Sequence, residues 1–372
     1  MQSVFRKDKK MLIFESLFTP KNNSYGPANY PAEQLLYFDI ETTGLSADTS
    51  SLYLIGCLYY RDNTWHTIQW FADDYQSEKA LLTAFFDFMK DFSVLIHYNG
   101  TGFDIPYLQK KCKQHKLSFS FEAIQSLDIY KELTPYKKLL PLPNLKQKTI
   151  EGILGIQRED KYDGGQLIQV YVEYIHNKFK KTTGCEDCLS LLLLHNREDL
   201  EGLLQASILL LSPELIEKDT QCTEETKEEA LRYSLKFPYQ LTSTLTLEKG
   251  AIELTLPKAS SIGTLTLHPF TGELKYFYPN YKDYYYLPIE DTAIHKSVAS
   301  YVEKEYREKA KACNCYTKHS GVFLPIPPGF SLPEDVPLFR QDYKDKVLWF
   351  EIKDDFLNNT LLLLNYLKEA LK

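Results

Sequence analysis

The chain has 372 residues, of which 44% are hydrophobic and 25% are charged, and its formal net charge is −7. These proportions are those of an ordinary soluble globular protein, and the length is sufficient for two domains. The negative charge argues against a protein that coats nucleic acid non-specifically, but it leaves room for an enzyme with a local basic channel.

The sequence predicts neither a membrane span nor a signal peptide. No apolar stretch approaches the ~18 residues of a transmembrane helix, and the apolar residues near the N-terminus are soon interrupted by Glu15. The seven cysteines are odd in number and irregularly spaced, which argues against a disulfide framework. We therefore expect a cytoplasmic protein without a membrane partner.

Hydrophobic periodicity predicts three strands, a helix and a further strand after an N-terminal arm. Runs with alternating or continuous apolar residues are typical of strands, whereas apolar residues three and four apart are typical of a helix. The predicted elements are the arm at residues 1–30, strands at 35–41, 52–60 and 65–71, a helix at 77–91 and a short buried strand at 94–96.

Two carboxylates stand at the end of the first predicted strand. Side chains alternate along a strand, so Asp39 and Glu41 point to the same face. Burying both costs several kcal/mol unless a cation neutralises them, and a divalent metal with oxygen ligands would do so. The following Thr42-Thr43-Gly44 favours a turn at which the backbone can approach a ligand. The alternative is a pair of solvated acids at a fraying strand end.

A third acid, Asp104, follows a glycine-rich turn after the strand at 94–96. Asn99, Gly100 and Gly102 permit an unusual backbone, and helical periodicity begins at Phe103. A carboxylate at this place is either a metal ligand beside the first two acids or only a helix cap.

Residues 110–148 form a basic segment in this acidic protein. It contains nine lysines and only three acidic residues. The segment is either a groove that follows a phosphate backbone or a solvated helix face.

A fourth acid lies in a leucine-rich helical pattern. His195 and Asp199 are four residues apart, so on a helix they share one face. Imidazole titrates near neutral pH, which suits a general base. A buried histidine that is merely satisfied by hydrogen bonds is the alternative.

The C-terminal part of the chain has a different sequence pattern. We predict a charged linker at 213–230 and an α+β accessory domain with antiparallel strands at 231–372. Within that domain, a helix is expected at 293–313 and another at 356–371. The tyrosine-rich stretch 274–286 either stacks on bases of a single strand or belongs to a strand packed on both sides.

The three acidic blocks occur in the order D-x-E, N-G-x-x-F-D and H-x-x-x-D. Over residues 30–212 this order resembles the DEDD superfamily of 3′–5′ exonucleases, and most closely its YprB-type ribonuclease-H-like branch. The resemblance implies an α/β domain at 31–212 with a ribonuclease-H-like mixed five-stranded sheet flanked by helices. It does not extend to the second domain.

The resemblance also implies a site. Two divalent cations, Mg²⁺ or Mn²⁺, would be held by Asp39, Glu41, Asp104 and Asp199, with Asp39 between both ions. His195 would be the general base. Better-known members have a tyrosine four residues before the last aspartate or a histidine five before it, so a tyrosine elsewhere or a metal-bound hydroxide remains an alternative base. The weaker candidates, for contact with substrate, are Thr42, Thr43, Asn99, Gly100, Phe103 and Lys146.

The sequence therefore predicts a metal-dependent nuclease. The expected activity is 3′–5′ exonuclease hydrolysis of single-stranded DNA or RNA ends by a two-metal-ion mechanism. The alternatives are a catalytically inactive nucleic-acid-binding module on the same fold and a structure-selective endonuclease. The sequence does not identify protein partners.

Overall fold

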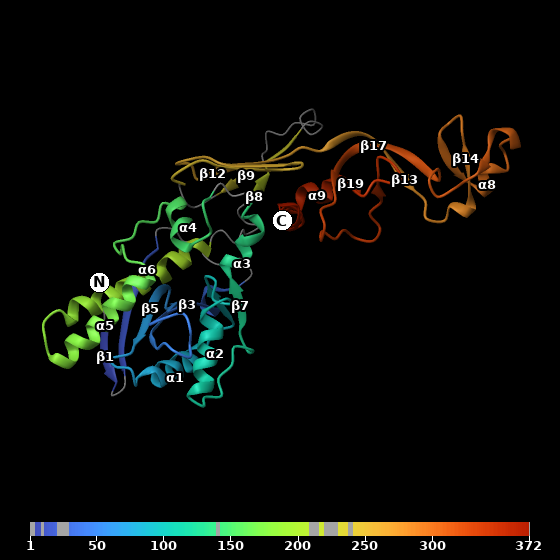
Figure 1. The fold of residues 1–372 in the computed structure, drawn as a ribbon. Helices are drawn as coiled ribbons and strands as arrows, with labels where there is room; N and C mark the ends of the chain where they lie inside the picture. Colours follow the sequence, from blue (N-terminus) through green and yellow to red (C-terminus); the bar gives the residue numbers. More distant parts are fainter. Residues whose placement is uncertain are drawn as a thin grey trace. The chain divides into compact units, whose positions relative to one another are not determined.

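A computed structural model describes residues 4–8, 11–20, 30–138, 142–207, 216–218, 230–236 and 241–371. The chain forms two compact units, residues 1–212 with 238–243 and residues 213–237 with 244–372 (Figure 1). None of the helices described is long and apolar enough to span a lipid bilayer.

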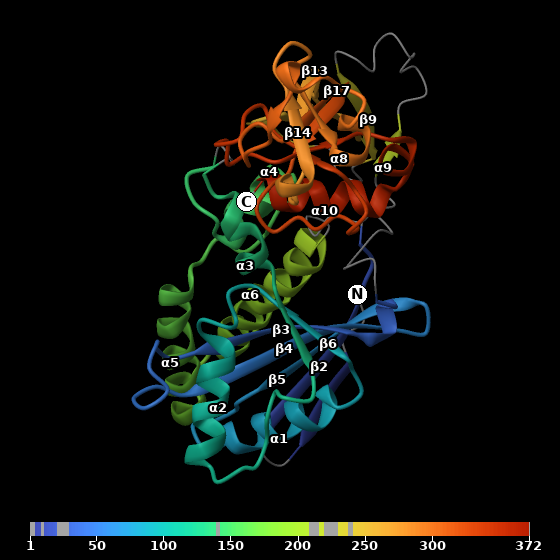
Figure 2. The same cartoon turned by 90° about the vertical axis from the view of Figure 1, so that its right-hand side faces the viewer.

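The first unit is built on one mixed sheet of seven strands. The central strand β3 pairs antiparallel with β4 and parallel with β6. The sheet order is β1-β2-β5-β4-β3-β6-β7, and Figure 2 shows its strands side by side. The strands are β1 (Val4–Asp8), β2 (Met11–Phe18), β3 (Leu35–Thr42), β4 (Leu52–Arg61), β5 (Thr64–Phe71), β6 (Val94–His97) and β7 (Gln125–Asp128).

The predicted fold class is confirmed, with two additions to the sheet. Strands β5-β4-β3-β6-β7 make up the five-stranded ribonuclease-H-like core, in which β7 was not recognised because its residues are largely polar. Residues 1–30 were interpreted as an arm, yet they contribute the hairpin β1–β2. Strand β2 pairs with β5 from Leu12↔Phe71 to Phe18↔Trp65. The hairpin therefore forms by pairing with the edge of the sheet.

The two faces of β3 contact different helices. Phe38 points to the face of α1, where its ring stacks on Phe85 at 5.4 Å. Tyr37 and Asp39 point to the opposite face, toward α6, where they bond Ser207 and Asn196. The helices of this unit are α1 (Glu78–Met89), α2 (Asp104–Gln114), α3 (Ile129–Leu133), α4 (Gln147–Ile153), α5 (Gly164–Lys180) and α6 (Cys185–Ala206).

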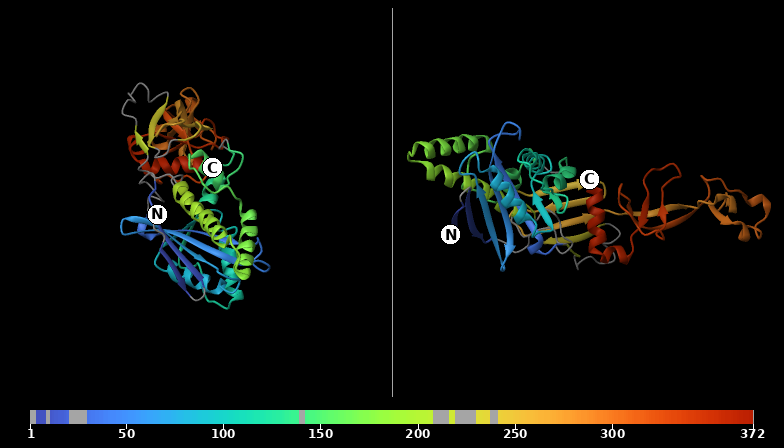
Figure 3. Two further views of the ribbon diagram at one scale, coloured as in Figure 1. Left: turned by 90° about the vertical axis from the view of Figure 1, so that its left-hand side faces the viewer. Right: turned by 90° about the horizontal axis from the view of Figure 1, so that it is seen from below.

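Helix α6 lies unusually close to the sheet. Its neighbour α5 runs beside it (Figure 3). Gly56, opposite Asp39 in the β3–β4 ladder, faces α6, and a Cβ there would clash with Asn196 Oδ1 and lie 2.8 Å from Leu200 Cδ1. Glycine at this position therefore allows the helix that carries His195 and Asp199 to approach the strand that carries Asp39 and Glu41.

The second unit is formed from three antiparallel sheets, as predicted. The yellow strands of the largest lie side by side in the right panel of Figure 3. Its order is β10-β11-β12-β9-β8, and the others are β13-β17-β19-β18 and β15-β14-β16. The strands are β8 (Ile216–Lys218), β9 (Leu231–Lys236), β10 (Leu245–Lys249), β11 (Ile252–Leu256), β12 (Ile262–Leu267), β13 (Phe270–Phe277), β14 (Tyr284–Leu287), β15 (Thr292–His295), β16 (Glu308–Lys309), β17 (Tyr316–Pro325), β18 (Leu338–Phe339) and β19 (Trp349–Glu351).

The four-stranded sheet closes on itself. Arg340, directly after β18, forms an antiparallel bridge with Lys275 of β13, which joins the two ends of the sheet. Leu274, Phe323 and Phe339 form the buried cluster of this small closed structure. Closure removes the unpaired edges that an open sheet would present.

The helix predicted at 293–313 is wrong. The segment begins in strand β15, which pairs with β14, continues as the four-residue helix α8 (Lys296–Ala299) and ends beyond β16. Strand β15 pairs with the tyrosine-rich strand β14 just before it, from Tyr284↔His295 to Leu287↔Thr292, and this hairpin overrides the helical periodicity. The helix predicted at 356–371 is divided at Asn359 into α9 (Asp354–Asn358) and α10 (Thr360–Leu371). Most of the predicted linker at 213–230 lies outside the described residues.

Candidate metal centre

The centre of the site is the pair of acids on β3. Glu41 is only 8% exposed. Asp39 Oδ2 accepts a hydrogen bond from Asn196 Nδ2 at 2.9 Å. Asn196 Oδ1 in turn accepts from Gln69 Nε2 of β5 at 2.8 Å. The orientation of the Asp39 carboxylate is therefore set by a chain of amides that runs from the sheet through α6.

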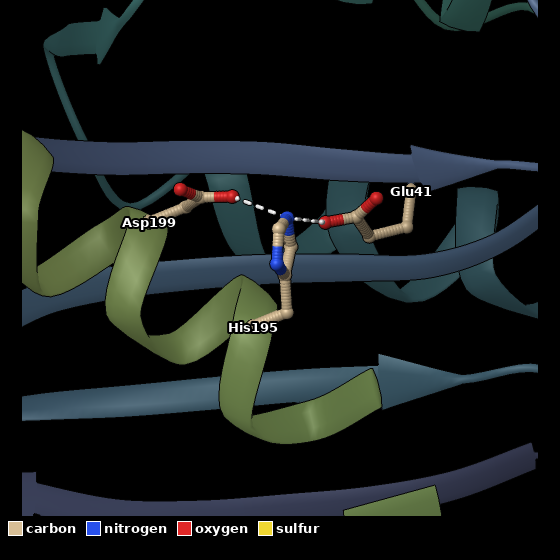
Figure 4. A group of neighbouring side chains, drawn as sticks. All are labelled: Glu41, His195 and Asp199. Atoms are coloured by element: carbon tan, nitrogen blue, oxygen red, sulfur yellow. Dashed lines mark ion pairs between the residues drawn. The ribbon is translucent and has the colours of Figure 1, made fainter. Parts of the chain in front are cut away.

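Helix α6 brings His195 and Asp199 to the same place. His195 Nε2 lies 3.1 Å from Asp199 Oδ2 and 3.7 Å from Glu41 Oε1 (Figure 4). Ligand atoms of these three residues all lie within 4.8 Å of one another. The geometry is the one expected for residues four apart on a helix that faces the strand.

Asp104 is the first residue of α2, and a second carboxylate shapes the turn before it. Asp128, at the end of β7, accepts hydrogen bonds from the backbone N–H groups of Asn99 at 2.8 Å and Thr101 at 3.2 Å. Asn99 has a left-handed φ of 60°. At Gly100 a Cβ would lie 2.7 Å from the His97 ring, so the turn needs glycine there. The turn directs Asp104 toward the acids of β3, whose pKa values its charge raises.

The acids influence one another strongly. Burial and then the charge of Asp199 raise the pKa values of Asp39 and Glu41 well above their ordinary values. Burial also raises the pKa of Asp104 to about 7. For Asp199, burial is outweighed by the hydrogen bond from His195 and the charge of Arg158, so its pKa is lowered. One acid of the cluster is therefore neutralised by protein groups and three are not.

Besides Asn196 and Gln69, three further residues of the site were not predicted, and these three come from α4 and the loop after it. Arg158 Nη1 lies 2.6 Å from Asp199 Oδ1, and its Nε lies 2.5 Å from Glu151 Oε2 of α4. Asp160 Oδ2 lies 2.6 Å from His195 Nδ1. In the sequence Arg158-Glu159-Asp160 has the character of a solvated charged loop, and no spacing links it to the three acidic blocks.

The weaker candidates for substrate contact lie around the turns. Thr42 Oγ1 donates to Gly44 O, and Thr43 Oγ1 accepts from Ser51 N, so both hydroxyls stabilise the turn after β3. Phe103 packs against Tyr107, with ring centroids 5.6 Å apart. Asn99 and Lys146 are exposed, Lys146 at the N-cap of α4. Within the described residues, no hydrogen bond or ion pair joins these side chains to the acid cluster.

Several lysines of the basic segment at 110–148 contact groups of the protein itself. Lys111 is 5% exposed and pairs with Glu78 at 2.9 Å, while Lys110 pairs with Asp48. Lys148 Nζ donates to Tyr162 O at 2.5 Å and lies 3.4 Å from Asp160 Oδ2. At least these three lysines therefore have internal partners.

The donor set fits a divalent cation. Carboxylate oxygens are the ligands that Mg²⁺ and Mn²⁺ prefer in proteins. In the described part of the chain, no lysine or arginine forms an ion pair with Asp39, Glu41 or Asp104. Such a concentration of buried negative charge favours a bound cation, because the imidazole of His195, 3.7 Å from Glu41 Oε1, is shared with Asp199 and Asp160.

Comparison with known families agrees with the topology. Residues 36–207, somewhat less than half of the chain, match the family model RNase_H_2 of the RNase_H superfamily. The first unit thus has a ribonuclease-H-like fold, and a domain of antiparallel sheets follows it. No curated protein matches the sequence.

Solved structures with some similarity match this chain over only part of their own length. A family B DNA polymerase from Pyrobaculum calidifontis is 12% identical, with a TM-score of 0.37, over 68% of this chain and 35% of the polymerase. E. coli exonuclease I in a complex with single-stranded DNA is 13% identical, with a TM-score of 0.28, over 54% of each chain. The same enzyme in complex with a dA16 oligonucleotide is 14% identical to this chain, with a TM-score of 0.27. The chain spans about a third of the polymerase and about half of exonuclease I.

Proposed function

We propose that this protein is a metal-dependent nuclease that removes nucleotides from the 3′ ends of single-stranded DNA or RNA. The observation that carries the proposal is the convergence of Glu41, His195 and Asp199, whose ligand atoms lie within 4.8 Å of one another. Asp39 and Asp104 add negative charge, and no lysine or arginine among the described residues forms an ion pair with either. A ribonuclease-H-like fold with such a cluster is suited to hydrolysis of a phosphodiester.

Each acid has a defined part in this proposal. Asp39, Glu41, Asp104 and Asp199 would hold two divalent cations, which supply activation of the attacking water and stabilisation of the leaving 3′ oxygen. Asn196 and Gln69 orient the Asp39 carboxylate. His195 Nε2 faces the acids and would accept the proton of the attacking water.

Hydrolysis of 5′-labelled single-stranded DNA and RNA, with Mg²⁺ or Mn²⁺, tests the proposal. We expect a ladder that shortens from the 3′ end, that needs the metal, and that is lost by at least about 10³-fold in Asp39→Asn and Asp199→Asn, because both remove a charge on which the transition state depends. Asp87→Asn is the matched control, since Asp87 is an exposed acid on α1.

The other outcomes separate the alternatives. Cleavage of a circular single strand would indicate an endonuclease on the same fold. Retained binding without hydrolysis of any substrate would contradict the nuclease proposal and favour a binding module. Near-normal hydrolysis by either site variant would show that the acid cluster is not the active site.

A further inference from the structure

The buried carboxylate of Asp160 belongs to the loop between α4 and α5, outside the acid cluster. Its side chain is fully buried. Oδ2 lies 2.6 Å from His195 Nδ1, and Oδ1 accepts the backbone N–H of Tyr162 at 3.0 Å. An ionised carboxylate can only accept hydrogen bonds, so His195 Nδ1 is the donor in this pair.

Helix α6 itself holds this loop in place. Glu198 accepts the backbone N–H of Glu159 at 2.8 Å with one oxygen and that of Asp160 at 3.0 Å with the other. Because Glu198 is only three residues from His195, the helix that presents the imidazole also fixes the loop that presents its partner. Lys148 Nζ, 3.4 Å from Asp160 Oδ2, adds a positive charge behind the pair.

The two nitrogens of His195 consequently have different surroundings. Nδ1 faces Asp160, supported by Lys148, on the side of the loop. Nε2 faces Asp199 and Glu41 on the side of the acid cluster. The contact at Nδ1 therefore fixes the orientation of the ring, and with it the direction of Nε2.

We propose that Asp160 is a positioning residue for hydrolysis: by accepting the Nδ1–H of His195 at 2.6 Å, it holds the imidazole with Nε2 directed at the acid cluster. This inference rests on the proposed nuclease function. In the reaction, an O–H bond of water breaks as its proton passes to Nε2. The hydroxide oxygen bonds phosphorus, the bond from phosphorus to the 3′ oxygen breaks, and that oxygen keeps the electron pair and takes up a proton from solvent.

A purely structural Asp160 would instead only hold the loop. Its hydrogen bond from Tyr162 N is of that kind, since it closes a turn within the loop. The two roles differ in what they do to His195, so the decisive measurement observes the imidazole directly.

The first experiment is NMR of the full-length protein labelled with ¹⁵N at histidine, without metal and with Mg²⁺. We expect a downfield, exchange-protected proton coupled to Nδ1 of His195 in both conditions, assigned by its loss in His195→Gln. The signal should disappear or shift upfield in Asp160→Asn and be unchanged in Glu159→Gln, which alters an exposed carboxylate one residue away. Absence of the signal from the unaltered protein would overturn the proposal without any folded Asp160 variant.

The second experiment is steady-state hydrolysis of labelled single-stranded DNA with Mn²⁺. Asp160→Asn should lower kcat by about 10²-fold or more, in the range of general-base catalysis, with KM changed by less than about twofold. Glu198→Gln, which retains one of two acceptors, should give a smaller loss of kcat. Unchanged kcat in Asp160→Asn, or an increase of KM alone, would overturn the positioning role.

The two proposals fail separately. If no nucleic acid is hydrolysed, the nuclease function fails, while the Nδ1 proton signal still reports whether Asp160 controls the imidazole. If hydrolysis occurs with unchanged kcat in Asp160→Asn, only the inference about Asp160 fails.

Discussion

Two of the buried carboxylate groups in the first unit differ in their partners. Glu78, at the start of α1, lies 2.9 Å from Lys111 Nζ and 2.5 Å from His115 Nε2, and it also accepts Leu52 N at 2.8 Å. Asp39 and Glu41 have no lysine or arginine in an ion pair among the described residues. Both groups are buried, but Glu78 pairs with a lysine at 2.9 Å, whereas the neighbour 3.7 Å from Glu41 is the imidazole of His195.

This difference distinguishes a structural acid from a candidate ligand. At Glu78 the protein itself completes the charge balance, so an added ion has nothing to neutralise. At Asp39 and Glu41, burial and neighbouring acids raise the pKa values, which means that the folded protein disfavours the ionised forms until a cation is supplied. Burial of an acid alone does not indicate the candidate metal centre. A buried acid whose charge is not balanced by the protein does.

Removing one charge at each place should have opposite effects on stability. Glu78→Gln leaves Lys111 buried without its partner and should lower the free energy of unfolding by about 3–5 kcal/mol. Glu41→Gln removes an unbalanced charge and should leave the metal-free protein as stable as before or more stable. Urea unfolding followed by tryptophan fluorescence measures both, because Trp65 and Trp70 are buried in β5. Equal destabilisation by the two variants would contradict the proposed difference between the two groups of acids.

Metal ions should stabilise the protein only through the acid cluster. At a concentration about 100 times the dissociation constant, Mn²⁺ should add about 2.7 kcal/mol to the free energy of unfolding. The gain should persist in Glu78→Gln and be lost in Asp39→Asn. Thermal unfolding with and without Mn²⁺ tests this, and a gain that survives in Asp39→Asn would place the ion elsewhere.

The close approach of α6 to the sheet should matter more for the site than for the fold. Gly56→Ala would force Asn196 away and should cost about 1–3 kcal/mol of stability. Displacing His195 and Asp199 by about 1 Å should lower kcat on the order of 10²-fold. Gly152→Ala is the control, since a Cβ there meets nothing within 4 Å and alanine favours the helix. Comparable kcat values for the two variants would show that the approach is not needed.

The smallest expected effect is a dependence of stability on pH. The pKa of Asp104 is raised to about 7 in the metal-free protein, above its unfolded value of about 3.9. Its contribution is therefore fully present below about pH 4 and is lost as the pH rises through about 7. Asp104→Asn should flatten this part of the stability profile. A profile that is already flat in the unaltered protein would contradict the burial of an unbalanced acid.

Short-range periodicity explains what was foreseen correctly. The same face for Asp39 and Glu41 follows from the alternation of a strand, and the same face for His195 and Asp199 follows from a four-residue spacing on a helix. The strands and the helix between residues 35 and 97 follow from equally local patterns. Pairing between strands explains the errors, since β2 pairs with β5, which is distant in the sequence, and β15 pairs with the neighbouring strand β14.

The sequence by itself determined the orientation of the acids within each element, because a backbone of known period fixes which side chains share a face. Only the tertiary structure decided which elements meet. It placed Arg158 beside Asp199 and Asp160 beside His195, although both come from a loop of unremarkable charge. It also gave Glu78 a lysine partner, which Asp39 and Glu41 lack among the described residues. Charge balance depends on distances between separate segments, and those distances are set by packing rather than by any local pattern.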